Sequence, residues 1–469
     1  MRSKILPILS LFALLALGQA GCPWSGFDGV EKDAPVQVLE RPEKFSSPQF
    51  GLRFFMLTDA GYERSIVVSG QYTDPLAVIK LDASGRIGST RIARVDKNSV
   101  VLTDDRQKNL VEAMVRIGDS PRGEPRVLVG VPQYDYLRRV TIPETGSLLP
   151  EEARLYLTRP GGGELANLGG ALGAGDLNGI GSLDWIVAED HFTFFVMDEN
   201  TSEATALQSC PVTTPSSASE SMYRGIATGR FFEADPAGLQ TAAVGFPRTS
   251  GGEVLIFRFP SGEVDCSADL IVPPVAEPGT KPQFGTALLA ADLNGDGVDD
   301  LVVGSPDGAN SRVFVFMSSG APGSRSLQDL PSYTLMPSEV DPVDFGKALG
   351  LADLDGDGTP ELLVGDPRAS YRTNSGRVHI FRADWASGGA VLEEAFLGDP
   401  SPTAKLLGVD LKDATSGLGS CLGALDWGNP DWSGQELVVG ASELIFVYFL
   451  TTLTGDQGTD DASGLPDPR

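Results

Sequence analysis

Two acid-rich loops carry the side chains in this sequence that are best suited to binding a metal ion. Residues 292–300 have the sequence DLNGDGVDD, and residues 353–361, which lie 61 residues further on, have the sequence DLDGDGTPE. Oxygen-bearing side chains stand at loop positions 1, 3, 5 and 9, and glycines between them let the backbone wrap around one point. A hard cation such as calcium requires this kind of oxygen-rich loop. The side chains are Asp292, Asn294, Asp296 and Asp300 in the first loop, and Asp353, Asp355, Asp357 and Glu361 in the second.

The backbone carbonyl at position 7 is expected to add a fifth oxygen, from Val298 in the first loop and Thr359 in the second. Carboxylates held this close repel one another unless a cation lies between them. The alternative is a pair of Asp- and Gly-rich surface turns that hold no metal. Because two separate copies keep the same spacing, we predict two calcium sites.

The EF-hand calcium loop begins with the same pattern but continues differently. It requires a glutamate at loop position 12 and lies between two helices, whereas Val303 and Val364 occupy position 12 here. The segments that follow, DLVVG and ELLVG, are apolar runs that end in Gly-x-Pro, which favours strands. These loops are therefore predicted to join two strands and to close at position 9.

Both loops belong to a repeat of about sixty residues. The small residue that ends the second apolar segment recurs at intervals of 57 to 61 residues, with one longer interval of 75. A Phe-Gly position recurs upstream of it, and the segments 48–51 and 282–285 are both PQFG. Self-similarity at a fixed period is typical of repeat architectures. The small residues are Gly70, Gly130, Ala188, Gly245, Gly304, Gly365 and Gly440.

Each of the seven units contains four short segments with strand character. In the fifth unit these are Ala287–Ala291, Leu301–Gly304, Arg312–Met317 and Tyr333–Met336, in which Val, Phe and Leu are frequent. Helical spacing is nearly absent, and 56 glycines and 33 prolines interrupt the chain. An all-β solenoid also repeats, but its period is usually much shorter. The fold class is therefore predicted to be all-β, a seven-bladed β-propeller with four-stranded blades.

The two ends of the repeat region are predicted to share the last blade. After Gly440 there is one clear strand, Leu444–Leu450, and then a polar tail that cannot supply another. The missing strand is predicted at Val36–Glu40, which would complete the seventh blade and protect its edge. The propeller is accordingly expected to cover residues 36–453, with a disordered acidic tail at 454–469.

The order of Phe-Gly, a small-residue strand, a D-x-[DN]-x-D-G-x-x-[DE] loop and a V-G-x-P strand resembles the FG-GAP repeat of integrin α-subunit β-propellers. The resemblance covers about residues 36–453 and is strongest in units five and six. It implies a seven-bladed propeller that binds calcium in loops on its lower face and ligands on the opposite, upper face. Integrins dock a second subunit on that upper face, and no feature of this sequence reproduces that.

Two other units depart from the loop pattern. Unit three has DLNGIGSLD, which keeps Asp176, Asn178 and Asp184 but has Ile180 in place of the central acid, so a weaker third calcium site is expected there. Units one, two and four have no recognisable loop. Unit seven has a longer loop that contains Asp426, Asn429, Asp431 and Glu436.

Residues 1–21 have the features of an export signal. Two basic residues precede an apolar run from Ile5 to Leu17, which is too short to span a bilayer comfortably. Small residues then precede Cys22, as in a bacterial lipoprotein cleavage site. Cys22 is therefore expected to be the lipidated first residue of the mature protein, with residues 22–35 as its lipidated end and tether. Gln19 departs from the usual aliphatic residue, so conventional signal cleavage is the alternative.

Charge and compartment restrict the partners. The formal net charge of −27 disfavours nucleic acid or an anionic membrane face as a partner, so membrane contact is expected through the N-terminal lipid only. Weak calcium sites fill outside the cell, where calcium is abundant. We therefore expect an exported protein of the cell envelope, at the outer membrane or cell surface.

The remaining cysteines have different expected roles. Cys421 takes the place that Ala287 has in unit five, and a buried thiol is expected there. Cys210 and Cys266 lie in or beside the fourth-strand segments of units three and four. Neighbouring blades could bring them within disulfide range in an oxidising compartment, and the sequence leaves that pairing open.

Catalysis has little support in this sequence. The histidines are His191 and His379, and both are expected to be structural parts of strands. There is no G-x-S-x-G, H-E-x-x-H or Cys-x-x-Cys motif. The acids fall in the calcium loops, which are expected to offer no apolar environment to raise a carboxyl pKa. We therefore predict that the protein is not an enzyme.

The function predicted is a surface-anchored, calcium-binding adhesion or binding module for an unidentified extracellular or envelope protein or glycan. Rigid blades hold loops, and loops carry recognition. Two alternatives remain: an envelope-associated enzyme or accessory domain, such as a lyase or hydrolase that uses the propeller channel, and a structural envelope protein. The connection 385–417 contains VLEEAFLG, which is expected to add a strand or short helix. Candidate upper-face residues are Tyr134, Asp135, Tyr136, Arg368, Tyr371 and Arg372.

Overall fold

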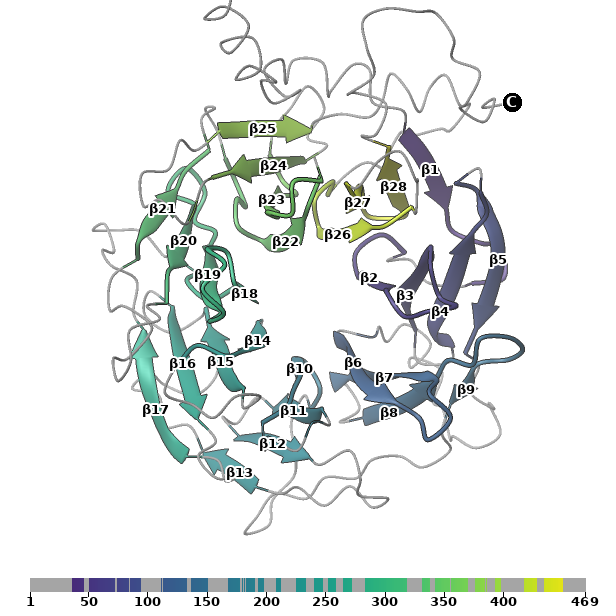
Figure 1. The fold of residues 1–469 in the computed structure, drawn as a ribbon, viewed down its shortest axis with the longest axis horizontal. Coiled ribbons are helices and arrows are strands. Elements are labelled where there is room, and N and C mark those ends of the chain that lie inside the picture. Colours follow the sequence, from purple (N-terminus) through teal and green to yellow (C-terminus); the bar gives the residue numbers. More distant parts are fainter. Residues whose placement is uncertain are drawn as a thin grey trace, which may run out of the picture.

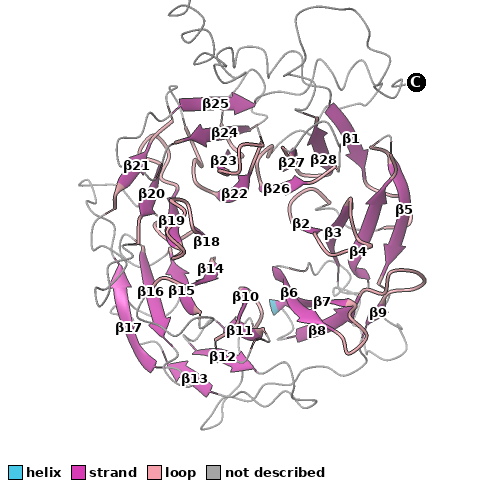
Figure 2. Ribbon diagram, viewed as in Figure 1, coloured by secondary structure: helices cyan, strands magenta, loops and turns pink. Residues whose placement is uncertain are grey.

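The computed structural model consists of strands, turns and loops, with no α-helix among the residues it describes. This confirms the predicted all-β class. A 3₁₀ turn at Pro132 is drawn as helix in Figure 2. The described residues are 36–45, 50–71, 74–83, 85–93, 111, 113–132, 136–150, 168–177, 179, 181, 183–189, 193–197, 208–211, 225–232, 240–247, 252–258, 265–271, 283–318, 331–337, 342–354, 356–369, 376–383, 385, 393–397, 417–427 and 434–449.

The described strands form seven four-stranded antiparallel sheets, arranged around a central opening (Figure 1). This arrangement is consistent with a β-propeller. Sheet 1 contains β2 (Phe54–Leu57), β3 (Ser65–Gln71), β4 (Asp74–Leu81) and β5 (Ile87–Ile92). Sheet 2 contains β6 (Ala113–Asp119), β7 (Pro125–Val131), β8 (Tyr136–Thr141) and β9 (Leu149–Pro150). Sheet 3 contains β10 (Leu172–Gly175), β11 (Asp184–Glu189), β12 (Thr193–Met197) and β13 (Gln208–Pro211).

The remaining four sheets follow the same order. Sheet 4 contains β14 (Ile226–Gly229), β15 (Thr241–Phe246), β16 (Glu253–Arg258) and β17 (Asp265–Ile271). Sheet 5 contains β18 (Ala287–Ala291), β19 (Asp300–Ser305), β20 (Arg312–Phe316) and β21 (Tyr333–Leu335). Sheet 6 contains β22 (Ala348–Ala352), β23 (Glu361–Asp366), β24 (Arg377–Arg382) and β25 (Glu393–Leu397). Sheet 7 contains β26 (Cys421–Leu425), β27 (Glu436–Gly440), β28 (Leu444–Tyr448) and β1 (Val36–Glu40).

Sheet 7 combines the two ends of the described chain. Its strand order is β1-β28-β27-β26. β1 pairs with β28 in antiparallel register from Val36 opposite Tyr448 to Glu40 opposite Leu444. The strand predicted at 36–40 is therefore present, as the outer strand of the last sheet.

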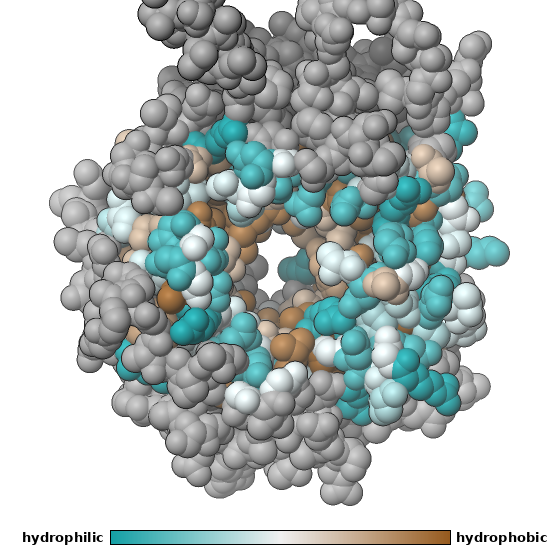
Figure 3. All heavy atoms as spheres, in the orientation of Figure 1, coloured by the Kyte–Doolittle hydropathy of each residue, from teal (hydrophilic) through white to brown (hydrophobic). Residues whose placement is uncertain are grey.

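The second strand of each sheet is buried on both faces. All six residues of β19 and all six of β23 are buried. Their Val- and Leu-rich sequences suit strands that are covered on both sides. The first strands β18 and β26 are half-buried and face the central opening, around which Figure 3 shows apolar residues.

The core is divided among the seams between sheets. Seven clusters of buried apolar side chains occur among the described residues, and each joins two successive sheets. One cluster packs Val302 of sheet 5 against Leu362 of sheet 6. Another packs Ile66 of sheet 1 against Val438 of sheet 7. Each sheet therefore contributes one face to the seam on either side of it.

Five of the seven small residues that revealed the repeat, all of them glycines, lie where one sheet approaches the next most closely. A Cβ added to Gly304 would meet the carbonyl oxygen of Gly346 in the next sheet at 2.0 Å. The same pairing joins Gly365 to Gly419 at 2.0 Å, and Gly440 to Gly51 of sheet 1 at 1.8 Å. Because backbone meets backbone, no side chain fits there. The Phe-Gly and V-G positions are thus two halves of one contact.

Part of the segment VLEEAFLG in the long connection belongs to sheet 6. Its residues Glu393–Leu397 form β25, which pairs with β24 from Arg382 opposite Glu393 to Val378 opposite Leu397. β25 is therefore the fourth strand of its own sheet rather than an addition to it. The other described residue of the connection before β25 is Trp385, which is buried.

Cys421 joins sheet 7 to sheet 1. Its thiol lies 3.3 Å from the carbonyl oxygen of Phe54 and 3.4 Å from the Phe54 nitrogen, in hydrogen-bonding geometry with both. Burial raises the pKa of the Cys421 thiol to about 11. It pairs with Gly440 as Ala287 pairs with Gly304, as the sequence alignment of the units predicted.

The side chains of Cys210 and Cys266 fall outside the described part of the structure, although their backbones lie in β13 and β17. Their pairing stays a prediction. Residues 1–35, which include Cys22, and the tail 454–469 are also outside the described residues. Within the described residues, no helix has the length and apolar character needed to cross a membrane.

The seam contact predicts that Gly304→Ala destabilises the fold by about 3 kcal/mol, since the new methyl group would overlap the Gly346 carbonyl. Urea denaturation would measure the loss. Gly123→Ala is the matched control, because Gly123 has φ 75° and nothing within 4 Å of an added Cβ, so only about 1 kcal/mol of backbone strain is expected. Equal losses in the two variants would contradict the seam argument.

Candidate calcium-binding loops

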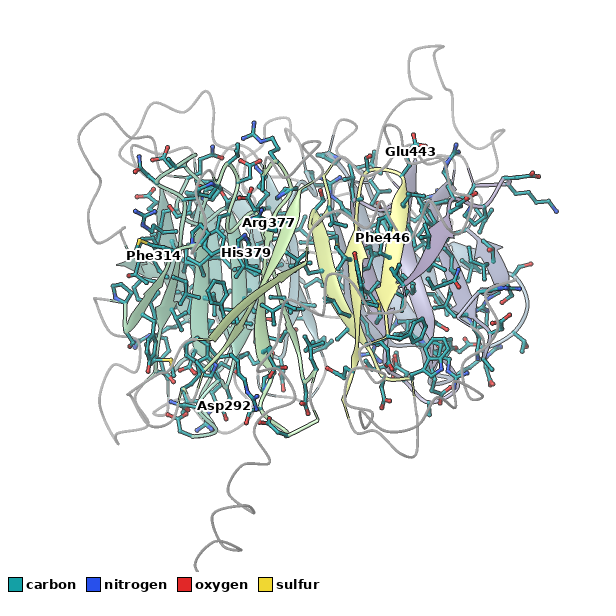
Figure 4. All side chains as sticks on the ribbon, turned by 90° about the horizontal axis from the view of Figure 1, so that it is seen from above. Asp292, Phe314, Arg377, His379, Glu443 and Phe446 are labelled. Atoms are coloured by element: carbon teal, nitrogen blue, oxygen red, sulfur yellow. The ribbon has the colours of Figure 1, made fainter. Side chains whose placement is uncertain are left out.

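The predicted metal loops are the turns between the first and second strands of sheets 5, 6 and 3. Residues 292–299 join β18 to β19, and residues 353–360 join β22 to β23. Figure 4 shows Asp292 at one end of the sheets and Glu443, which lies between β27 and β28, at the other. The loops therefore gather on one face of the molecule, as the resemblance implied.

Glycine fixes the backbone shape of all three loops. Positions 4 and 6 have positive φ: 74° and 83° at Gly295 and Gly297, and 75° and 87° at Gly356 and Gly358. The corresponding pair in sheet 3, Gly179 and Gly181, has 73° and 86°. Side chains other than glycine rarely adopt this left-handed conformation. The two glycines of the third loop therefore have the same backbone conformation as those of the other two loops.

The acid at position 1 accepts a hydrogen bond from the backbone N–H at position 6 in each loop. The distances are 2.8 Å from Gly297 N to Asp292, 3.0 Å from Gly358 N to Asp353, and 2.8 Å from Gly181 N to Asp176. Such bonds hold the first carboxylate over the loop. Asp296 N also donates to Asp292 (3.0 Å) and to Asn294 (2.9 Å).

The acid at position 9 is buried and accepts from the N–H at position 2. Asp300 receives Leu293 N at 3.0 Å, Glu361 receives Leu354 N at 2.8 Å, and Asp184 receives Leu177 N at 2.9 Å. Asp300 also accepts from Ser318 N at 2.7 Å and Ser318 Oγ at 3.1 Å. All three acids are at most 5 % exposed. The acid at position 9 is therefore a predicted ligand that also closes the loop, through its hydrogen bond to the N–H at position 2.

Burial changes the acidity of these groups. Desolvation raises the pKa of Asp300 to about 6, although hydrogen bonds from Ser318 and Leu293 oppose the rise. Desolvation likewise raises the pKa of Glu436, at the start of β27, to about 7. The expectation that these loops offer no environment to raise a carboxyl pKa was wrong. The physical reason is that the last loop position already belongs to the buried second strand.

Strand register shows which sheets carry this buried acid. Asp300 lies opposite Ala291, and Glu361 opposite Ala352, at the last pair of the first and second strands. The same register position holds Ser65 in sheet 1, Pro125 in sheet 2 and Thr241 in sheet 4. A buried acid occurs at this register position in sheets 3, 5, 6 and 7, in each of which an acid also directly follows the first strand. It is therefore linked to the loop rather than to the fold.

Sheet 7 follows the acidic pattern in part. Glu436 is 1 % exposed and accepts a hydrogen bond from Trp427 N at 3.1 Å, as Asp300 does from Leu293. Asp426 precedes Trp427 at the position of Asp292. Asn429 and Asp431 lie outside the described residues.

The donors suit a hard cation, but their side chains are not gathered into a cage. They are carboxylate, amide and carbonyl oxygens, which calcium prefers. No three Asp, Glu, His or Cys side chains within the described ranges are grouped closely enough to hold a metal. The carboxylates accept from the loop's own N–H groups, as Asp296 does from Val298 N at 2.9 Å. Coordination thus requires side-chain rotation on a backbone that already has the wrapped shape.

Some predicted ligands have other contacts or are not described. Val298 O lies 3.4 Å from Ser318 Oγ, Thr359 N donates to Asp357 at 2.7 Å, and Asp357 forms an ion pair with Arg382 at 3.0 Å. Asp355 and Asn178 lie outside the described residues. The roles of Ser318 and Arg382 were missed, because both residues come from third-strand ends that sequence spacing does not connect to the loops.

The described histidine has a structural environment. His379 in β24 is 1 % exposed and packs edge-on against Phe345, with ring centroids 5.0 Å apart. Phe381 stacks on it at 6.4 Å. His191 lies outside the described residues. The surroundings of His379 are those expected of a core side chain.

The face opposite the loops carries a charged network in sheet 6. Asp366 at the end of β23 accepts from Asp344 N at 2.7 Å and Val343 N at 3.1 Å, which ties down the segment before Phe345. Asp344 in turn pairs with the exposed guanidinium of Arg368. Of the predicted upper-face residues, Arg368 is the one whose side chain is described.

The sequence matches the family model described as FG-GAP repeat at residues 284–316 and 345–381. The chain contains FG-GAP repeats. Each match begins at the Phe-Gly of the seam contact, spans the acidic loop and ends in the third strand of sheet 5 or sheet 6. The family named from the sequence is thereby confirmed for these two units.

Several curated proteins are similar to part of this chain. Integrin alpha-4 of Xenopus laevis is 37% identical over 90 residues, which is 18% of this chain and 8% of the integrin. Integrin alpha-PS3 of Drosophila melanogaster is 33% identical over 111 residues, or 22% and 9%. Human phosphatidylinositol-glycan-specific phospholipase D is 34% identical over 93 residues, or 19% and 11%. The chain thus spans about a tenth of the length of these relatives.

Loss of the buried acid at position 9 is predicted to destabilise the fold more than loss of the exposed acid at position 5. The comparison is made in a calcium-free buffer that contains a chelator. Asp300→Ala leaves Leu293 N–H and Ser318 N–H without their acceptor, so a loss of about 2 kcal/mol in unfolding free energy is expected. Asp296→Ala removes an exposed side chain, so a change of no more than about 0.5 kcal/mol is expected. Chemical denaturation of both variants measures this difference. A smaller loss for Asp300→Ala than for Asp296→Ala would refute the structural role of position 9.

Proposed function

We propose that this protein is an exported, calcium-binding β-propeller that serves as a binding or adhesion module at the cell surface. The observation that carries the proposal is the repeated loop: three sheets place the same glycine-shaped turn, with acids at positions 1 and 9, on one face. Rigid sheets that hold loops at both ends are suited to recognition.

In this proposal the seven sheets are the blades of a closed ring. The apolar cluster between sheets 7 and 1 and the Gly440–Gly51 approach are of the same kind as those at the other seams. Gly51 N also lies 3.4 Å from Ser442 O across that seam. The N-terminal strand β1 would close the ring as the outer strand of the last blade.

Calcium would occupy the loops of sheets 5 and 6, with a weaker third site in sheet 3. Asp292, Asn294, Asp296 and Asp300, with Val298 O, form the proposed donor set in sheet 5, and Asp353, Asp355, Asp357 and Glu361, with Thr359 O, form that in sheet 6. A bound cation would offset the cost of ionising the buried Asp300. The third loop lacks the central acid, since Ile180 stands at position 5.

The face opposite the calcium loops would bind the partner, an extracellular or envelope protein or a glycan. Arg368 is exposed there, and the buried Asp344 fixes its guanidinium. Arginine that is held in place loses little side-chain freedom on binding, which favours contact roles. The similarity to integrin α subunits supports a binding module of this type.

Export and anchoring would depend on the N-terminal residues. The signal-like segment 1–21 and the integrin relatives support an exported protein. Lipidation at Cys22 would hold the mature chain at the cell envelope, as an outer-membrane or cell-surface lipoprotein.

A second candidate function is an envelope-associated enzyme or an accessory domain of such an enzyme. The matches to phosphatidylinositol-glycan-specific phospholipase D from human and from Bos taurus favour it, at 34% and 30% identity. These matches cover 11% and 13% of those proteins. The histidine among the described residues, His379, is buried in the core and has no access to a substrate. We therefore favour recognition over catalysis.

Calcium is predicted to raise the melting temperature of the purified protein. A ligand at one hundred times its Kd stabilises the folded state by about 2.7 kcal/mol per site. Asp296→Ala and Asp357→Ala should each remove one site from the calorimetric stoichiometry, and the double variant should lose most of the thermal shift. Magnesium at the same concentration is the control cation. An unchanged melting temperature on addition of chelator would rule out the calcium assignment.

Partner binding is predicted to depend on Arg368. The immobilised protein would be exposed to a glycan array and to envelope extract, with and without chelator. Arg368→Ala should abolish capture, whereas Arg122→Ala, an exposed arginine in the β6–β7 turn on the loop face, should not. Equal capture by both variants would place the binding surface elsewhere. Hydrolysis of phosphatidylinositol-glycan by the protein itself would favour the second candidate.

A further inference from the structure

The face that carries the acidic loops also contains a contact between two neighbouring sheets. One of its partners, Gln435, is not part of the loop pattern. In sheet 7, Gln435 immediately precedes β27 and reaches Asp353, the position 1 acid of sheet 6. Gln435 N donates to Asp353 O at 2.7 Å, and Asp353 N donates to Gln435 Oε1 at 3.0 Å. One residue of the following sheet therefore satisfies both backbone groups of a predicted calcium ligand. We call this two-bond contact the reciprocal clamp.

The reciprocal clamp recurs at two other seams. Gln240 of sheet 4 makes it with Asp176 of sheet 3, with both distances 2.9 Å. Asp299 of sheet 5 makes it with Arg230 of sheet 4, at 2.8 Å from Asp299 N to Arg230 O and 2.7 Å from Arg230 N to Asp299 Oδ2. The clamping residue always directly precedes the second strand, and an amide or a carboxylate oxygen serves as the acceptor.

Two of the three clamped residues are position 1 acids of the candidate loops. The carboxylate of Asp353 accepts from Gly358 N, so its position is set by its own backbone and by the loop glycine. Fixing the Asp353 N–H and C=O restricts that backbone before any cation binds. Pre-organisation of this kind strengthens binding by lowering the ordering cost.

The seam between sheets 5 and 6 cannot contain this clamp. Pro360 directly precedes β23, at the position of Gln435. Proline has neither an N–H donor nor a side-chain acceptor. The loop at Asp292 is therefore built without the contact, and it provides an internal comparison within the same molecule.

We propose that Gln435 is a positioning residue for the calcium loop of sheet 6, and that it couples calcium binding in that sheet to the docking of sheet 7. The inference rests on the proposed calcium sites. Coupling between two sites is reciprocal, so calcium at Asp353 strengthens the contact of sheet 7 by the same factor by which the contact strengthens calcium binding.

Calorimetric calcium titration tests the clamp in two backgrounds. The Asp296→Ala variant lacks the sheet 5 site and retains the sheet 6 site. In this background, Gln435→Leu should raise the calcium Kd about fivefold, as loss of one hydrogen bond implies. Gln435→Glu keeps an acceptor oxygen, as Asp299 does in its own clamp, and should restore the Kd. In the Asp357→Ala background, which retains the sheet 5 loop, Gln435→Leu should leave the Kd within twofold.

Amide hydrogen exchange provides a readout apart from affinity. Calcium should slow exchange at the Gln435 amide in the Asp296→Ala protein, because the Asp353 carbonyl that accepts it becomes fixed. The same amide should not respond in the Asp357→Ala protein.

The outcomes separate this inference from the proposed function. If Asp296→Ala protein binds calcium equally well with and without Gln435→Leu, the clamp has no positioning role and the calcium sites stand. If Gln435→Leu weakens both loops alike, its effect is a general loss of structure and the proposal is overturned. If neither background binds calcium, the calcium sites fail and the clamp fails with them.

Discussion

The fold depends on the closeness with which one sheet can approach the next. At the end of the second strand, the α-carbon of Gly304 lies against the Gly346 carbonyl, and corresponding glycines make the same contact at other seams, including Gly440 against Gly51. Replacing either glycine with a larger residue would push two whole sheets apart, since backbone cannot yield as a side chain can. Below this contact, alternating faces of Val, Leu and Phe fill each seam with its own apolar cluster. The repeat period in the sequence is therefore the number of residues between one such contact and the next.

The opposite ends of the same strands carry the polar chemistry. Because the second strand is buried on both faces, its first residue is withdrawn from water, and an acid there needs partners. Asp300 obtains them from Leu293 and Ser318, at the cost of a raised pKa. The loop and the core are therefore not separable layers: the residue that ends the cation loop is also the first residue of the interior. Arg382 and the seam contact of Gln435 extend the same loops into neighbouring strands.

Local spacing was sufficient to predict the turns and strands. The positions of Asp292 and Asp353 and the glycines between their acids follow from patterns within about ten residues, which set backbone conformation directly. The strand at 36–40 was predicted from the repeat instead, because the last unit lacks a strand of its own. The burial of Asp300 and the partners of Asp353 did not follow, because they depend on residues that are distant in the chain. Gln435 is 82 residues from Asp353, and no periodicity links an amide in one sheet to a carboxylate turn in another. The fourth strand of sheet 6 was also ambiguous, since an unusually long connection surrounds Glu393–Leu397 and masked its register.

The shared sheet has a mechanical consequence. β1 is joined to β28 along five paired positions, from Val36 to Glu40. Any pulling force transmitted through the residues before Val36 is applied first to this outermost ladder. The load then passes through β28 and β27 toward Glu436 and the turn that faces sheet 6. A protein tethered by its leading segment would therefore feel tension at the sheet that combines the first and last described strands.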